Sequence, residues 1–269
     1  MRASWVCNLP ERGAFARQGK ISVVILALQL AACGRDPAAS RTQQPTPASG
    51  SGAEGRGAVT DYNAAVEYRS LYAAMGMPLV SVLQDSAGTL TPEVERLLPT
   101  AKPVLDRLIW ATRLERCDWG VDYSAGSQTA LPHLPELREL SRLLRADAYR
   151  ALDVGDTDAA TEAVGALVRL SRHVDGKSLV DKTVAFAILR TAIQLVTENN
   201  VWSVSQRRRL FEEFVRIDSD DPFGGEAGLA WEEELALREG RRVDEQTFHQ
   251  VKQLTVNELF VVMRLLESR

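Results

Sequence analysis

Hydrophobic residues recur at helical spacing along nearly all of the chain after residue 60, and this periodicity constrains the fold most strongly. The clearest example follows Pro132, where Leu137, Leu140, Leu144 and Ala148 lie three or four residues apart and so share one face of a helix. No run of alternating apolar and polar residues is comparably strong. The sequence therefore predicts an all-α domain with essentially no sheet.

Two of the predicted helices meet at Gly155. Glycine is a common helix terminator, and Asp156 or Thr157 can cap the next helix. A connection this short requires an antiparallel hairpin. The second helix of this hairpin carries its small and apolar residues on one face: Ala160, Ala163, Val164, Leu167, Ser171 and Val174.

Similar patterns predict the remaining helices. They run from Asp61, as cap, to Gly76; from Thr91, as cap, to an interruption at Pro99; from Pro103 through Thr112; from about Ser178 to Glu198; after Ser205; from Trp231 to Arg238; and through Phe248 to Met263. Residues 117–131 fit none of them and are expected to form a long loop.

Charge argues against nucleic acid as a partner. The chain has a formal charge of −4, and its first 33 residues hold a surplus of three positive charges, so the remainder carries about −7. Binding to a phosphate backbone needs clustered Lys and Arg. The one basic run, Arg207 to Arg209, is flanked by Glu212 and Glu213. We interpret it as a solvated helix face, with a local phosphate or headgroup contact as the alternative.

The N-terminal segment has the order of an export signal. Basic residues precede an uncharged apolar stretch of ten residues, from Ile21 to Leu30, which is shorter than the roughly 20 residues of a membrane-spanning helix. The residues that follow, Leu30-Ala31-Ala32-Cys33-Gly34, resemble the lipobox of bacterial lipoproteins. The alternatives are a secreted protein cut at the small residues and a cytosolic chain with a chance apolar stretch.

The lipoprotein resemblance implies that the signal peptide, residues 1–32, is removed and that Cys33 carries the lipid. Two or more acyl chains give stable membrane anchoring. Because Gly34 rather than Asp follows the cysteine, the resemblance favours the outer over the inner membrane in a two-membrane cell. Cys7 would leave with the signal and Cys33 would be lipidated, so Cys117 has no cysteine with which to form an intrachain disulfide.

Residues 33–58 form the expected linker, and residues 59–269 the helical domain. The linker is rich in Gly, Ala, Ser, Thr, Pro and Gln and has almost no large apolar residue, a composition typical of a disordered tether. It contains a G-x-G-x-x-G pattern from Gly50 to Gly55. No strand is predicted before this pattern, so we do not interpret it as a nucleotide site.

A second resemblance concerns the predicted hairpin. Gly155-Asp156-Thr157-Asp158-Ala159-Ala160, with Val164 and Leu167 behind it, resembles the start of the second helix in a tetratricopeptide repeat. The likeness implies stacked antiparallel hairpins, as in an α-solenoid, and a protein-interaction role. No second copy of the pattern follows at the expected spacing. The middle third of the chain is also similar to uncharacterised helical proteins of environmental bacteria, which have no known activity.

No catalytic, metal or cofactor motif is evident. The histidines, His133, His173 and His249, are far apart and lack metal-ligand spacing, and there is neither a G-x-S-x-G elbow nor a P-loop. His133 stands at a predicted helix start, where we assign it a capping or packing role. The acidic group from Asp218 to Asp221 lacks the ligand spacing of an EF-hand and is interpreted as helix capping.

The loop after residue 116 is the one candidate functional region. It places Cys117, Asp118, Trp119, Asp122 and Tyr123 among glycines, and loops held by rigid elements often carry function. In the alternative interpretation Trp119 and Tyr123 plug the ends of helical hairpins, and Cys117 is a small buried hydrophobe.

The sequence thus favours a lipid-anchored protein of the cell envelope, with its domain facing the periplasm or the exterior. The membrane and other envelope proteins are the expected partners, and no small-molecule ligand is specified. We expect the domain to act as an interaction or scaffold module. The alternative is an exported hydrolase that uses carboxylates near the Cys117 to Tyr123 loop.

Overall fold

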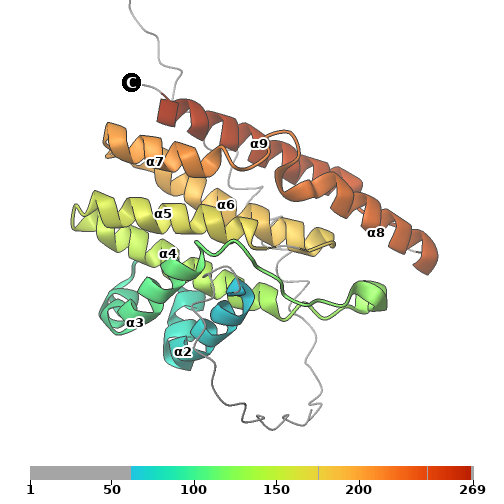
Figure 1. The fold of residues 1–269 in the computed structure, drawn as a ribbon, viewed down its shortest axis with the longest axis horizontal. Coiled ribbons are helices and arrows are strands. Elements are labelled where there is room, and N and C mark those ends of the chain that lie inside the picture. Colours follow the sequence, from blue (N-terminus) through green and yellow to red (C-terminus); the bar gives the residue numbers. More distant parts are fainter. Residues whose placement is uncertain (1–61, 175, 241, 268–269) are drawn as a thin grey trace, which may run out of the picture. The chain divides into compact units, whose positions relative to one another are not determined.

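The computed structural model describes residues 62–174, 176–240 and 242–267, and this part of the chain contains helices and no strand. The predicted all-α fold is confirmed. The predicted signal peptide, Cys33 and the linker all lie outside the described residues. The α-helices are α2 (Ala64–Asp85), α3 (Pro92–Ala111), α4 (His133–Asp153), α5 (Thr157–Arg172), α6 (Leu179–Glu198), α7 (Val204–Phe214), α8 (Gly225–Glu239) and α9 (Glu245–Glu267) (Figure 1).

Several helix starts follow from their capping residues. Thr91 accepts a hydrogen bond from the Val94 amide, and Asp156 accepts one from the Ala159 amide, as the sequence predicts. The first helix differs. Asn63 caps it, accepting a bond from the Ala65 amide at 3.1 Å, and the predicted cap, Asp61, lies outside the described residues.

Proline does not interrupt α3, so the predicted break at Pro99 is wrong. Both Pro99 and Pro103 lie inside a continuous helix. Each removes one backbone hydrogen bond, but both are exposed, so water can satisfy the carbonyl groups that they leave without a donor. The opposite face of the helix is held in the core by Val94, Leu98, Ala101, Leu105 and Leu108.

Gly76 breaks the helical geometry of α2, in agreement with the predicted helix end there. Its φ of 71° and ψ of 151° lie in a region that favours glycine. The chain returns to helical geometry beyond Gly76 and continues to Asp85. The element α2 therefore consists of two helical pieces rather than one that ends at the glycine.

The predicted hairpin is formed by α4 and α5, and α5 lies at the centre of the fold. Gly155 turns the chain with a φ of 76°. Helix α5 packs against α4, α6 and α7, and Figure 1 shows it running between α4 and α7. Most of its residues are buried, and its narrow polar side, with Glu162 and Arg169, faces α7. The other faces of the core come from α2 with α3 and from α6 with α9.

The last three helices, α7 to α9, do not pack only against their neighbours in the chain. Helix α7 packs mainly against α5 and α9, and α8 packs against α6 and the short 3-10 helix η4 (Pro222–Gly224). A second 3-10 helix, η3 (Tyr123–Gln128), lies in the predicted loop. None of the helices in the described ranges is both long enough and apolar enough to cross a bilayer.

Candidate functional site

The loop between α3 and α4 places Trp119 in the protein interior, where its side chain is 6% exposed. The indole stacks on the Tyr68 ring at a centroid distance of 5.9 Å and on the His133 ring at 4.8 Å. The Tyr68 ring also contacts His173. We call Tyr68, Trp119, His133 and His173 the aromatic cluster. It joins the loop to α2, to α4 and to the end of α5.

Hydrogen bonds fix the loop to the C-terminal end of α5. The indole Nε1–H of Trp119 donates to the backbone carbonyl of His173 at 2.9 Å, and the Cys117 sulfur lies 3.5 Å from the same oxygen. His173 is the C-cap residue of α5, where carbonyl groups lack partners within the helix. The loop supplies such a partner, so Trp119 closes the end of a helical hairpin.

Tyr68 and His173 form a buried pair. The Tyr68 hydroxyl oxygen lies 2.6 Å from Nδ1 of His173. Burial, and then the nearby charge of Arg172, lower the pKa of His173 from 6.5 to about 4, so the ring is neutral at pH 7. A neutral Nδ1 can accept the hydroxyl proton, and burial raises the pKa of Tyr68, which keeps that proton on the oxygen.

Asp181 lies next to the aromatic cluster, at the start of α6. Its Oδ2 accepts hydrogen bonds from the hydroxyl groups of Tyr123 at 2.9 Å and Ser178 at 2.7 Å. Its Oδ1 is 3.5 Å from Nε2 of His133. Burial raises the pKa of Asp181, but the contact with His133 and the hydrogen bonds from Ser178 and Tyr123 outweigh it and lower the pKa below its usual value. Asp181 is therefore an ionised group inside the protein.

The pair of His133 and Asp181 has the residue types of an acid–base pair but not its accessibility. Both side chains are 0% exposed. Neither ring nitrogen of His133 forms a hydrogen bond of good geometry within the described part of the chain. A general base must reach the proton of a substrate. In this conformation the pair can hold charge in the core but cannot contact a substrate.

The two carboxylates predicted for the loop, Asp118 and Asp122, point away from the aromatic cluster. Asp118 and Asp122 are exposed, and their Oδ1 atoms accept the backbone amides of Gly120 and Ser124, each at 2.9 Å. The pKa of Asp122 is lowered by its hydrogen bonds with Ser124. The backbone of residue 118 is held by Asn63, which bonds both its amide and its carbonyl. The structure thus separates the five predicted loop residues, with Cys117, Trp119 and Tyr123 turned inward.

Tyr68, His173 and Asp181 were not predicted as partners of the loop. Tyr68 and His173 are 105 residues apart, and Tyr123 and Asp181 are 58 apart. No spacing rule connects such positions. Ser178 and Asp181 carry a local signal, because they form the capping box of α6. Within the described residues, no group of His, Cys, Asp and Glu side chains is arranged to hold a metal ion.

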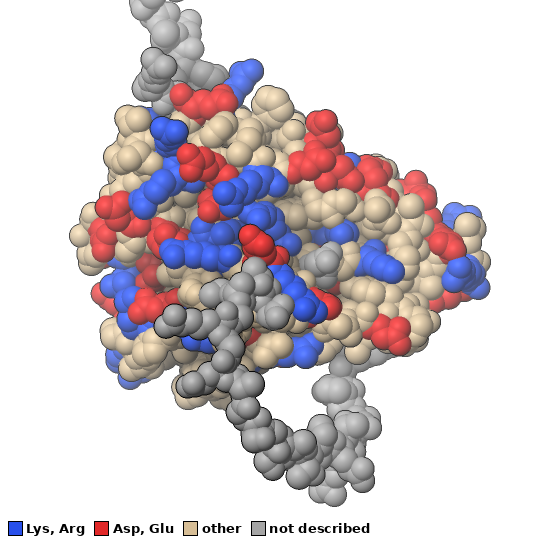
Figure 2. Space-filling model, viewed as in Figure 1, with Lys and Arg blue, Asp and Glu red and all other residues tan. Residues whose placement is uncertain are grey.

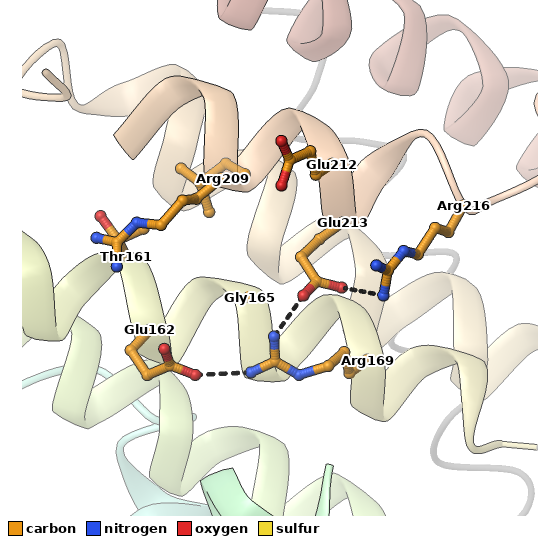
Figure 3. A pocket seen from close by; sticks show the side chains of 9 residues that line it. Thr161, Glu162, Gly165, Arg169, Arg209, Glu212, Glu213 and Arg216 are labelled. Atoms are coloured by element: carbon orange, nitrogen blue, oxygen red, sulfur yellow. Dashed lines mark hydrogen bonds and ion pairs between the residues drawn. The ribbon is translucent and has the colours of Figure 1, made fainter. Parts of the chain in front are cut away.

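A second candidate is an open polar pocket of about 210 Å³ between α5 and α7, which we call the α5–α7 pocket. The face drawn in Figure 2 carries a group of Lys and Arg side chains near its centre, over this part of the fold. Figure 3 shows Arg169 lying across the pocket between Glu162 and Glu213. The remaining lining residues are Thr161, Gly165, Arg209, Leu210, Glu212 and Arg216.

Searches against models of protein families, curated proteins and solved structures gave no match to this chain.

Proposed function

We propose that this protein is an exported bacterial lipoprotein, anchored in the cell envelope through a lipid on Cys33, and that its helical domain acts as an interaction or scaffold module. The sequence Leu30-Ala31-Ala32-Cys33 behind an apolar stretch supports the anchor. In a two-membrane cell, the glycine after the cysteine favours the outer membrane. The domain then faces the periplasm or the exterior and meets other envelope proteins.

The structural role of the candidate loop favours a binding module over an enzyme. The candidate loop uses its aromatic residues to hold helices together, since Trp119 is packed between two rings and its N–H is bonded to the end of α5. The aspartates of this loop are engaged in local turns. The loop is therefore part of the scaffold, and the outer faces of the helices are available for partners. A tetratricopeptide-like role rests on the resemblance around Gly155 alone.

The anchor is tested by substituting Cys33. We expect the wild-type protein to sediment with membranes and Cys33→Ser to remain an uncleaved precursor or to appear in the soluble fraction. Cys117→Ser is the matched control and should fractionate like the wild type. Mass spectrometry of the mature protein should find a diacylglyceryl-modified Cys33 at the amino terminus. An unmodified mature terminus at any other residue refutes the lipoprotein assignment.

The second candidate is an exported hydrolase, and the buried carboxylate beside the loop is the observation that favours it. Asp181 contacts both Tyr123 and His133, as an acid–base pair would. Asp181→Asn keeps the shape and removes the charge. If this variant melts like the wild type but fails to complement a deletion strain, the hydrolase becomes the better proposal. A lower melting temperature with retained function supports the structural role.

A further inference from the structure

The floor of the α5–α7 pocket is built from Gly165 and Arg169. A Cβ atom on Gly165 would lie 3.3 Å from Nη1 of Arg169, so the glycine leaves the room in which the guanidinium lies along the helix. Glycine inside a helix is less favourable than alanine. Here that cost is offset by ion pairs, because Arg169 donates to Glu213 at 2.6 Å and to Glu162 at 2.8 Å.

Arg169 neutralises the pocket's inner carboxylates. Its side chain is 11% exposed, and its Nε also donates to Thr112, so the guanidinium is fixed from three sides. Glu162 is further paired with Arg113 at 2.9 Å. Glu212 also lines the pocket, but its nearest partner is Arg208, at 3.3 Å. The acidic residues of the lining are therefore already matched by arginines.

The exposed arginines of the lining, Arg209 and Arg216, and Arg172 just outside it, are not matched in the same way. Arg216 and Arg172 both approach Oε2 of Glu213, each at 3.7 Å, which is beyond hydrogen-bond distance. Glu213 thus faces three guanidinium groups with one negative charge. The side chains of Arg209 and Arg216 are 50% and 59% exposed. Arg209 donates a hydrogen bond to Asp158 at 2.7 Å.

Positive charge is crowded at Arg172. Burial and the neighbouring guanidiniums of Arg216 and Arg169 lower its pKa, against the opposing effect of Glu213. Glu213 already supplies one anion to this group, and three guanidiniums around a single carboxylate leave an excess of positive charge that favours a further anion nearby. The basic side chains in Figure 2 lie on this face of the molecule, and Figure 3 shows Arg209 and Arg216 on either side of Glu213.

We propose that the α5–α7 pocket binds a phosphoryl group, with Arg209 and Arg216 as its principal ligands. Guanidinium groups present planar pairs of N–H donors that match phosphate oxygens, and several of them suit a dianion better than a single carboxylate. The pocket, at about 210 Å³, admits a small group of this kind. The site goes beyond the proposed function and does not depend on the lipid anchor.

The test is calorimetric titration of the full-length Cys33→Ser protein, in detergent and at low ionic strength, with inorganic phosphate and with glycerol 3-phosphate. Removing two charged donors, in Arg209→Gln/Arg216→Gln, should weaken binding of both probes at least about tenfold. The control, Arg238→Gln/Arg264→Gln, changes the charge equally at two exposed positions on other helices and should bind like the wild type. Both doubly substituted proteins should melt like the wild type, which separates lost binding from lost folding.

The two probes distinguish the sources of the phosphoryl group. Tighter binding of glycerol 3-phosphate indicates a phospholipid headgroup, while equal or weaker binding than that of inorganic phosphate indicates a free phosphate. Either outcome supports the site. If neither probe binds, or if the control loses as much affinity as the pocket variant, the proposal is wrong and the arginines serve only to hold α7 on α5. A failure of lipidation at Cys33 leaves these outcomes unchanged.

Discussion

Replacing Trp119 with alanine removes the ring that lies between Tyr68 and His133 in the aromatic cluster. The change has two structural effects. It leaves a cavity where the loop meets α2 and α4, and it takes away the N–H that bonds the His173 carbonyl. Both effects reduce the stability of the folded state, and neither alters a charge.

The expected cost follows from these two effects. A buried indole removes about 150 to 250 Å² from water, which at about 25 cal/mol per Å² amounts to roughly 4 to 6 kcal/mol as an upper bound. Measured Trp→Ala changes in protein cores cost about 3 to 5 kcal/mol. We therefore expect Trp119→Ala to lower the free energy of unfolding by about 4 kcal/mol. Trp119→Phe keeps most of the ring and loses the N–H, so about 1 to 2 kcal/mol is expected.

Urea unfolding followed by far-ultraviolet circular dichroism measures these differences without relying on the fluorescence of the replaced tryptophan. The urea midpoint should fall by about 1 to 2 M for Trp119→Ala. Asp118→Asn, at an exposed neighbour in the same loop, should stay within about 0.5 kcal/mol of the wild type. The packing argument is refuted if Trp119→Ala unfolds at the wild-type midpoint, or if Trp119→Phe costs as much as Trp119→Ala.

Two other predictions concern the core. The pKa of His173 is about 4 in the folded protein and 6.5 in the unfolded chain, so protonation of this ring destabilises the fold by about 3 kcal/mol as the pH falls from 6.5 toward 4. Urea midpoints measured across this pH range should fall for the wild type, and His173→Gln should lack this loss. Ala160→Trp should overpack the α4–α5 hairpin and cost about 1 to 3 kcal/mol, whereas Ala73→Trp, at an exposed position of α2, should cost little. Equal melting temperatures for these two variants would contradict the assigned faces.

Local signals were sufficient where a helix boundary depends on a few adjacent residues. The turn at Gly155, the cap at Thr91 and the break at Gly76 are each encoded within about four positions, and the structure places them where the sequence predicts. The same reasoning failed at Pro99, because exposure of the proline decides whether a helix can continue. Exposure is a property of the folded domain rather than of the segment.

The environment of α5 was predicted only in part. The periodic positions from Ala160 to Ser171 are buried as expected, but the opposite side of the helix is buried too. Glu162, which lies outside the predicted apolar face, is half-buried and paired with Arg113 and Arg169. The side of the helix that carries Glu162 and Arg169 is polar, so the sequence pattern does not distinguish a solvated face from one covered by another helix. The helix that covers this side is α7, which lies more than 30 positions further along the chain.

The candidate loop and the α5–α7 pocket differ in what a substitution does to the fold, and this difference decides where function is best sought. A change at Trp119 or Tyr123 alters the packing or the hydrogen bonding of α5 or α6, because their partners are His173 and Asp181. A lost activity there cannot be separated from lost stability without a melting curve. Arg209 and Arg216 are exposed and contribute little to the core, so a loss of binding in their variants reports on the ligand directly.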